Sequence, residues 1–427
     1  MIVIMFVLLF VFLAMGIPVA ISVGLPSLLY VIFEPSIPDF VSVQRMVSGI
    51  NTYSLLAIPF FIFAANLMNS GGITNRIFKS CEVGMGRVRG GLAYVNIIAS
   101  VIFAGMSGAA IADAGGLGSI EIKAMREAGY DERLTLGITA ASSLIGPIIP
   151  PSMPIIVYGV VASTSIGRLF AAGVIPGVLM AGMLAIMIFG LQHIWQLPRG
   201  NKTTIVEKIL AFKKAFLSLL TPIIILGGIF VGFFTPTEAA AIACLYALGL
   251  SFLYKELNWK SFLDTVKDSM ITTVQVLIIV ASASLFSWII AREQIPQMFV
   301  ELVARSGFSP WVIILLVNLL LLFVGLFMET VASINLLVPV LLPVMLTLGM
   351  DPVQFGVIII LNLVIGTMTP PFGTVLFVLS SVAEVSVETV TKSVVIFFPP
   401  LLLVLTLINM FPQLTLWLPN LIFGVIG

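Results

Sequence analysis

Long apolar segments alternate with short polar ones along the whole chain, and these segments predict membrane-spanning helices. Residues 1–33 are almost wholly apolar but are interrupted at Gly16 and Pro18. Pro236 separates two apolar runs at nearly the equivalent position of the second half, so we expect two short helices before Glu34, with the amino terminus outside. Other helices are expected near 47–68, 169–194, 215–234, 238–254, 270–290 and 394–418.

The segment from about 91 to 123 is predicted to enter the membrane and turn back. Basic residues flank both of its ends, and basic loops mark the cytoplasmic side. Two complete spans would need about 40 residues, which is more than the segment contains. Its middle, 104–118, is rich in Gly, Ala and Ser and carries Asp113. That composition is typical of a re-entrant tip that packs against protein rather than lipid.

The next span, 134–158, is predicted to unwind at mid-depth. It contains Pro147, Pro150 and Pro151, and prolines remove amide donors and disfavour helical geometry in the preceding residue. A second broken span is expected at 355–379, with its interruption at 366–373.

Both features return at a shift of about 220 residues. The shift aligns Phe103 with Phe323, Gly105 with Gly325, Ala112 with Ala332, Gly129 with Gly349, Asp131 with Asp351, and Gly146, Pro150 and Pro151 with Gly366, Pro370 and Pro371. Arg292 and Arg305 are the only basic residues that flank the second hairpin, so it is expected to enter from outside. The sequence therefore predicts two inverted repeats, joined by a linker at 196–214.

Composition supports the membrane assignment. Of the 427 residues 60% are hydrophobic and 9% are charged, and the mean hydropathy is +1.20, so we expect an all-α polytopic membrane protein surrounded by a lipid bilayer. A net charge of +1 indicates no particular partner, and we do not expect the chain to bind nucleic acid. Cys81 and Cys244 are the only cysteines, which disfavours a disulfide framework or a cysteine metal site.

The two tips and the two unwound helices are expected to meet near the middle of the membrane. Helix amino ends attract a carboxylate there, while free carbonyls and hydroxyls can hold a hard cation such as sodium. The candidate ligands are Gly105, Ser107, Gly108 and Asp113 facing Gly146, Ile149, Pro150 and Ser152, and Gly325, Met328, Glu329, Thr330 and Ser333 facing Gly366, Met368, Thr369 and Thr374. Each Gly or Ser could instead serve helix packing, and Asp113 and Glu329 could be caps on hairpin helices.

Four stretches taken together resemble the large membrane subunit of a tripartite ATP-independent periplasmic (TRAP) transporter. They are FAGMSGAAIADAGGLGSIEIKAM at 103–125, GITAASSLIGPIIPPSMPIIVYG at 137–159, FFTPTEAAA at 233–241 and IGTMTPPFGTVLF at 365–377. The resemblance covers essentially the whole chain and places it in the ion transporter superfamily.

The resemblance implies sodium-coupled import of a small organic acid, such as a C4-dicarboxylate or sialic acid, by an elevator mechanism. Residues 91–168 and 291–392 are then the transport domain, while 1–90, 169–290 and the C-terminal helix in 393–427 are scaffold. Two or more sodium ions are expected at Gly105, Ser107, Gly108, Gly146, Ile149, Pro150, Gly325, Met328, Thr330, Gly366, Met368 and Thr369. The substrate is expected at Ser107, Asp113, Ser152, Thr330, Ser333 and Thr374.

The implied partners are a soluble periplasmic binding protein and a small four-helix membrane subunit, which we expect to be a separate polypeptide. The implied location is the bacterial inner membrane. A single-component dicarboxylate or anion–sodium symporter of the same superfamily is the alternative. An intramembrane enzyme that uses Asp113 and Glu329 as an acid/base pair is disfavoured, because the chain has no HExxH or GxSxG motif, and the chain is not expected to be an enzyme.

Inversion of the two halves predicts that Arg126 and Gly349 face opposite sides of the membrane. Single cysteines at these two positions, in a Cys81→Ser and Cys244→Ser background, should react with a membrane-impermeant reagent from opposite sides of oriented vesicles. Labelling of both positions from one side would contradict the inversion.

Overall fold

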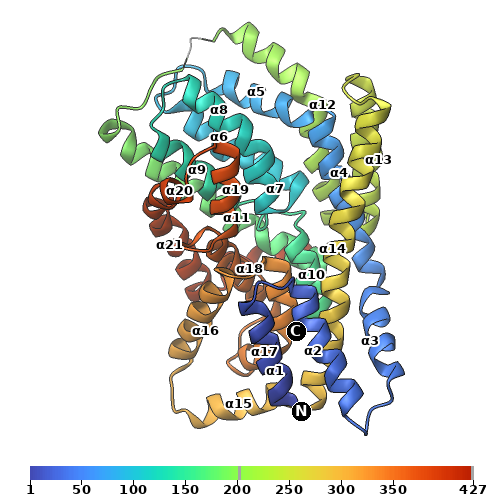
Figure 1. Ribbon diagram of the computed structural model, residues 1–427. Coiled ribbons are helices and arrows are strands. Elements are labelled where there is room, and N and C mark those ends of the chain that lie inside the picture. Colours follow the sequence, from blue (N-terminus) through green and yellow to red (C-terminus); the bar gives the residue numbers. More distant parts are fainter. Residues whose placement is uncertain (201–202, 425–427) are drawn as a thin grey trace.

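The computed structural model describes residues 1–200 and 203–424, except for the side chains of residues 106 and 107. Helices account for most of the described chain, and the amino terminus lies at the lower end of the molecule (Figure 1). Seven helices in the described ranges are long and apolar enough to cross a membrane. The expectation of an all-α polytopic membrane protein is therefore confirmed.

The first half contains α1 (Ile2–Ala14), α2 (Val19–Phe33), α3 (Phe40–Ile50), η1 (Tyr53–Leu56), α4 (Ala57–Ser70), α5 (Ile73–Met85), α6 (Gly91–Ser107), α7 (Ala110–Ala112), η2 (Asp113–Leu117), α8 (Gly118–Glu127), α9 (Glu132–Ser143), α10 (Met153–Val161) and α11 (Ile166–Ile194). The second half contains α12 (Ile205–Phe230), α13 (Pro236–Leu253), α14 (Trp259–Arg292), α15 (Ile295–Arg305), α16 (Pro310–Gly325), α17 (Thr330–Thr347), α18 (Pro352–Met368), α19 (Thr374–Ala383), α20 (Val387–Val394), η3 (Val395–Phe397), α21 (Phe398–Met410) and α22 (Gln413–Phe423).

The first two helices are separated by a glycine and a proline. Gly16 has a φ of +74°, a left-handed conformation that ends α1 and that glycine adopts without a steric penalty. Pro18 then precedes α2 as its N-cap residue. The predicted division of residues 1–33 into two short helices is confirmed.

Two helical hairpins lie in opposite halves of the molecule. Hairpin 1 comprises α6, α7, η2 and α8 (residues 91–127), and α6 packs against α8 and η2. Hairpin 2 comprises α16 and α17 (residues 310–347), which also pack against each other. Hairpin 1 lies in the upper half and hairpin 2 in the lower half of Figure 1. Each predicted hairpin is therefore present as a pair of packed helical arms.

Each hairpin is followed by an interrupted helix. Break 1 (residues 144–152) separates α9 from α10, and break 2 (residues 369–373) separates α18 from α19. Break 2 is shorter than predicted, because residues 366–368 remain helical. Pro147 has no counterpart in the second half, where Thr367 occupies the aligned position, so α18 continues until Thr369 precedes Pro370. The Pro150-Pro151 and Pro370-Pro371 peptide bonds are both cis.

Two of the predicted helices are interrupted in the structure. The apolar run 47–68 is divided between α3, η1 and α4, because the polar residues Asn51 and Thr52 leave helical geometry. The predicted last helix at 394–418 is divided between α20, η3, α21 and α22. Phe411 adopts an extended conformation because Pro412 follows it, and this residue ends α21.

Two other helices begin earlier than predicted. The linker at 196–214 is only partly a loop, because Thr204 and Glu207 form a capping box that starts α12 at Ile205. Asn258 caps α14, which therefore begins well before the apolar run at 270–290. Apolar runs mark only the hydrophobic part of such helices, since their polar first turns carry no hydropathy signal.

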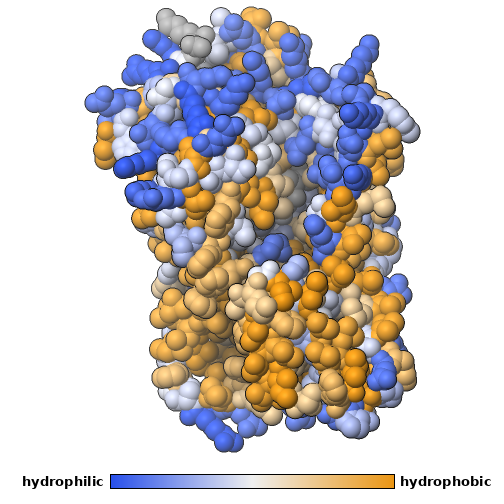
Figure 2. Space-filling view, in the orientation of Figure 1, coloured by the Kyte–Doolittle hydropathy of each residue, from blue (hydrophilic) through white to orange (hydrophobic). Residues whose placement is uncertain are grey.

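Polar and apolar surfaces are separated along the long axis. Hydrophilic side chains gather over the upper end and hydrophobic ones over the lower part, and the upper half of this face is hollowed (Figure 2). The upper end contains α5, α8 and the start of α12, which carry Lys79, Lys123 and Lys208 (Figure 1).

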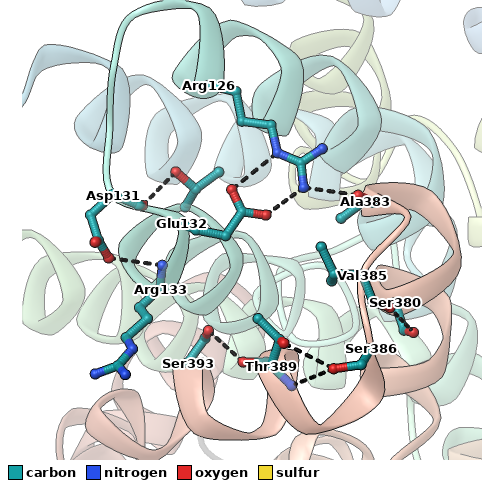
Figure 3. Close-up of polar contacts among 11 residues, drawn as sticks. Arg126, Asp131, Glu132, Arg133, Ser380, Ala383, Val385, Ser386, Thr389 and Ser393 are labelled. Carbon is teal, nitrogen blue, oxygen red and sulfur yellow. Dashed lines mark hydrogen bonds and ion pairs between the residues drawn. The ribbon is translucent and has the colours of Figure 1, made fainter.

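Arg126 joins the upper end of hairpin 1 to the second interrupted helix. Its guanidinium forms an ion pair with Glu132 and donates a hydrogen bond of 2.8 Å to the backbone oxygen of Ala383, the last residue of α19 (Figure 3). Asp131 caps α9 by accepting a hydrogen bond of 2.9 Å from the backbone amide of Arg133. Segments that lie far apart in the sequence are thus fixed to one another at this end.

Below this link, α9 and the α20–η3 segment approach each other closely at Gly137. A methyl group at this position would lie 2.3 Å from the Phe397 ring and 2.4 Å from the backbone oxygen of Ser393. Only glycine permits this distance between the two segments.

Gly137→Ala should therefore lower the thermal stability of the purified protein, because the added methyl group has to displace backbone; overpacking of this kind typically costs about 1–3 kcal/mol. Gly182→Ala in α11 is the matched control, since a methyl group there meets no atom within 4 Å. Equal unfolding midpoints for the two variants would contradict the close packing at Gly137.

Candidate functional site

The two hairpin tips and both interrupted helices border one cavity of about 50 Å³. Hairpin 1 contributes the residues after its turn, break 1 contributes prolines and the start of α10, hairpin 2 contributes the start of α17, and α18 contributes its last turn. The lining residues are Ala109, Ala110, Ile111, Pro147, Met153, Pro154, Glu329, Thr330, Val331 and Thr367. The two tips, break 1 and the last turn of α18 thus meet at this cavity, whereas none of the described residues of break 2 borders it.

Most of the residues that line the cavity are related by the shift of about 220 residues found in the sequence. Ala109, Ala110, Ile111 and Pro147 are aligned by it with Glu329, Thr330, Val331 and Thr367, and all eight residues border the cavity. Aligned positions therefore carry different side chains in the two halves: the first half supplies only apolar ones, and the second half supplies a carboxylate and two hydroxyls.

The tip of hairpin 1 touches the backbone of break 1. Gly108 has a φ of +60°, and a methyl group there would lie 2.7 Å from the backbone oxygen of Pro151. A methyl group at Gly105 would lie 3.8 Å from the backbone oxygen of Pro150, and one at Gly146 would lie 3.8 Å from the backbone of Ala109. Glycine at position 108 therefore allows backbone to approach backbone, whereas the distances at Gly105 and Gly146 are ordinary van der Waals contacts. The tight neighbour of Gly105 is instead the Pro222 side chain of α12, 2.8 Å from such a methyl group.

The tip of hairpin 2 touches α18 just before break 2. A methyl group at Gly325 would lie 2.7 Å from the backbone oxygen of Leu363 and 3.0 Å from the Cα of Gly366. A methyl group at Gly366 would lie 2.6 Å from the Cα of Gly325. These two predicted site residues thus face each other across the contact, with no room for a side chain on either.

Two helix amino ends at the cavity are capped by predicted site residues. Ser152 caps α10 by accepting a hydrogen bond from Ile155, while its hydroxyl donates to the backbone oxygen of Pro147. Glu329 caps α17, and its Oε2 accepts hydrogen bonds from the amides of Val331 (3.0 Å) and Ala332 (3.3 Å). Both residues therefore have the capping role that is common at helix starts.

The predicted substrate residues differ in their positions. Thr330 borders the cavity, but Asp113 does not and is buried within hairpin 1. Ser333 is fully buried, and its hydroxyl donates to the backbone oxygen of Glu329. The Thr374 hydroxyl is buried and has no hydrogen-bond partner, so it is available to a ligand. Ser107 lies outside the described side chains.

The remaining predicted sodium residues lie close to the two contacts. Met328 and Met368 are buried, in the tip of hairpin 2 and at the end of α18. The Thr369 hydroxyl donates to the backbone oxygen of Ile365. Ile149 packs its side chain against α11, where a methyl group at Gly177 would lie 2.2 Å from it. Ile149 thus offers a cation only its backbone oxygen.

Of the ten lining residues only Glu329 and Thr330 were predicted site residues; those missed were Ala109, Ala110, Ile111, Pro147, Met153, Pro154, Val331 and Thr367. The repeat register contained a signal for two of them, because it aligns Ala109 with Glu329 and Ala110 with Thr330. Ala109 and Pro147 carry no polar side-chain group, so a search for side-chain ligands passed over them.

Interrupted helices that enclose a cavity inside a polytopic membrane protein define the architecture of a membrane carrier. The fold is similar to the crystal structure of the Alcanivorax borkumensis YdaH transporter, with a TM-score of 0.69, 13% sequence identity and 88% of each chain covered. At this identity the similarity shows the fold alone.

The family follows from the sequence comparisons. The family model of the tripartite ATP-independent periplasmic transporter, DctM component, matches residues 6–414, and the chain belongs to this family. The chain is 47% identical to the sialic acid TRAP transporter large permease protein SiaM of Vibrio cholerae, over 96% of each chain. It is 42% identical to the sialic acid TRAP transporter permease protein SiaT of Haemophilus influenzae, over 95% of this chain and 66% of that one.

These comparisons confirm the resemblance seen in the sequence. The chain is a transporter permease and not an enzyme, and the acid/base role considered for Asp113 and Glu329 is dismissed.

The capping role of Glu329 can be tested by hydrogen exchange. Glu329→Ala should speed exchange of the Val331 and Ala332 amides, because loss of an N-cap typically costs about 0.5–2 kcal/mol. Glu329→Asn should preserve slow exchange, since its side chain retains a capping oxygen without the charge. Unchanged exchange in Glu329→Ala would show that the side chain does not hold the start of α17.

Proposed function

We propose that this chain is the large permease subunit of a sodium-driven importer for a small organic acid. The observation that carries the proposal is the single cavity bordered by both hairpin tips and both interrupted helices. Secondary carriers bind their substrates at such junctions, where half-helix ends and freed backbone groups replace the water around the solute. The relatives' names, which include sialic acid and C4-dicarboxylate, support an organic acid as the class of substrate.

The two tip–break contacts are the proposed sodium sites. Backbone oxygens of Pro150 and Pro151 lie beside the Gly105–Gly108 tip, and the backbone oxygen of Leu363 lies beside Gly325. Sodium prefers oxygen ligands, and backbone oxygens supply them without a net charge. The oxygens of Pro150 and Pro151 lie in break 1, outside helical hydrogen bonding, whereas Leu363 lies within α18 and would offer the second lone pair of its carbonyl. Each ion would therefore bind a hairpin to its neighbouring helix.

The substrate would bind between these contacts with a defined orientation. The amino end of α10 points its first residues, Met153 and Pro154, at the cavity and attracts the substrate carboxylate. Glu329 is exposed at the cavity and repels a carboxylate, so it suits hydroxyl or amide groups of the same molecule. The carboxylate would then lie on the α10 side and the uncharged groups on the α17 side.

The cavity has to widen to admit a substrate. It holds about 50 Å³, whereas pockets for small organic ligands start at about 300 Å³. The hollow in the upper half of the molecule offers a route, and it opens toward the end that carries Lys79, Lys123 and Lys208 (Figure 2). Basic residues mark the cytoplasmic side, so we assign this conformation to the inward-facing state.

The packing of α11 indicates which unit it would join in an elevator movement. Helix α11 packs against α6, α10, α18, α21 and α22 but only slightly against the α12–α14 region. The moving unit would therefore include α11 and α21–α22, together with 91–168 and 291–392, and would be larger than the sequence predicted. The scaffold would be formed by α1–α5 and α12–α14.

The proposed partners follow from the family. The family's name describes a transporter of three parts, one of which acts in the periplasm. We therefore propose a small membrane subunit and a soluble binding protein as the other two components. The SiaT match covers only 66% of that longer permease, which leaves room in SiaT for a second membrane subunit. The proposed location is the inner membrane of a bacterium.

Reconstitution tests the function directly. Uptake of a labelled organic acid into proteoliposomes should require an inward sodium gradient, the small subunit and the loaded binding protein. Gly366→Ala should abolish most of this uptake, because its methyl group would separate the tip of hairpin 2 from α18. Gly182→Ala should transport normally, since its methyl group meets no atom.

Full-rate uptake by this chain alone would replace the tripartite proposal with a single-component symporter. Full-rate uptake without sodium, with both partners present, would refute sodium coupling while leaving the tripartite assembly intact.

A further inference from the structure

Hairpin 1 encloses a cluster of polar side chains that does not border the cavity. Ser100 on α6, Asp113 on η2 and Glu121 on α8 are each only 1% exposed. They come from three successive elements of the same hairpin, so the hairpin itself brings them together.

The oxygens of this cluster have no hydrogen-bond partners. Both carboxylate oxygens of Asp113, Oε1 of Glu121 and Oγ of Ser100 are buried and unpartnered. The Ser100 hydroxyl faces Asp113 without reaching normal hydrogen-bond geometry, and the Asp113 and Glu121 carboxylates are close enough to repel each other. Four oxygens that need a partner therefore lie in one small region.

No basic side chain among the described residues compensates the two carboxylates. Lys123 and Arg126, on the same helix as Glu121, are exposed, and Arg126 pairs with Glu132. Phe103 and Leu117 belong to the apolar cluster around this hairpin, and the polar side chains that approach the hairpin from α5 and α4, Cys81 and Asn69, are uncharged. Two uncompensated carboxylates in such surroundings are strongly unfavourable, so something positively charged has to accompany them.

The backbone at Asp113 is also unusual. Residues 113–117 form a π-helical segment, and such segments recur at functional sites because they shift the register of a helix. Here the shift occurs at Asp113, the residue that faces both Ser100 and Glu121.

We propose that Ser100, Asp113 and Glu121 form a third cation site, in the interior of hairpin 1 and separate from the two tip–break contacts. A sodium ion satisfies several acceptor oxygens at once, whereas a proton supplies a single donor. One proton on the carboxyl pair neutralises the remaining charge. The coupling role of this site rests on the proposed function. The site would add one sodium ion that is carried within the moving unit.

Equilibrium binding of ²²Na⁺ to the purified chain tests the site without any transport step. Asp113→Asn and Glu121→Gln should each bind one sodium ion fewer than the wild type. Glu127→Gln is the control, because Glu127 is an exposed carboxylate on the same helix, and it should keep the full count. Ser100→Ala retains both carboxylates and should weaken the affinity of one ion only.

Wild-type sodium counts in both Asp113→Asn and Glu121→Gln would overturn the site and identify the pair as neutral through protonation. Should those variants not fold, unchanged affinity of every ion in Ser100→Ala would overturn it equally. Neither result bears on whether uptake is driven by sodium, because uptake is measured in a separate experiment. Conversely, a wild type that binds the third ion but transports without sodium would refute the proposed function and leave the site standing.

Discussion

Backbone groups released by a helix break have to find partners wherever neither lipid nor bulk water can supply them, and the rest of this structure depends on that constraint. The chain meets it at break 1 by pressing the tip of hairpin 1 against the interruption, while the tip of hairpin 2 presses against the last turns of α18, just before break 2. Gly108 lies against the backbone of Pro151, and Gly325 lies against Gly366. The cavity is the space left between the two contacts, so its position follows from the need to cover exposed backbone.

The two contacts are related by register but differ in chemistry. Break 1 spans nine residues because Pro147 ends helical geometry early, whereas break 2 spans five because Thr367 stays in α18. One side of the cavity consequently presents apolar side chains and the amino end of α10. The other side presents a carboxylate and hydroxyls. Segments that share one register in the sequence thus border a cavity whose two sides differ in chemistry.

Much of this arrangement could be predicted from the sequence. The paired prolines identified both breaks, because a proline's effect on the backbone is local and needs no tertiary information. Side-chain roles were harder to predict, since they depend on what lies opposite. Ile149 turns its side chain toward Gly177 in α11, and Asp113 turns inward to Ser100 rather than to the cavity. Helix starts such as Ile205 were misplaced because capping residues, not apolar runs, determine them.

The link between Arg126 and Ala383 has a mechanical consequence. It fastens the last turn of α8 in hairpin 1 to the last turn of α19, in the upper half of the molecule as drawn in Figure 1. The link opposes independent bending of hairpin 1 and α19 at this end. In the elevator movement proposed above, these two segments would therefore be displaced together rather than one after the other.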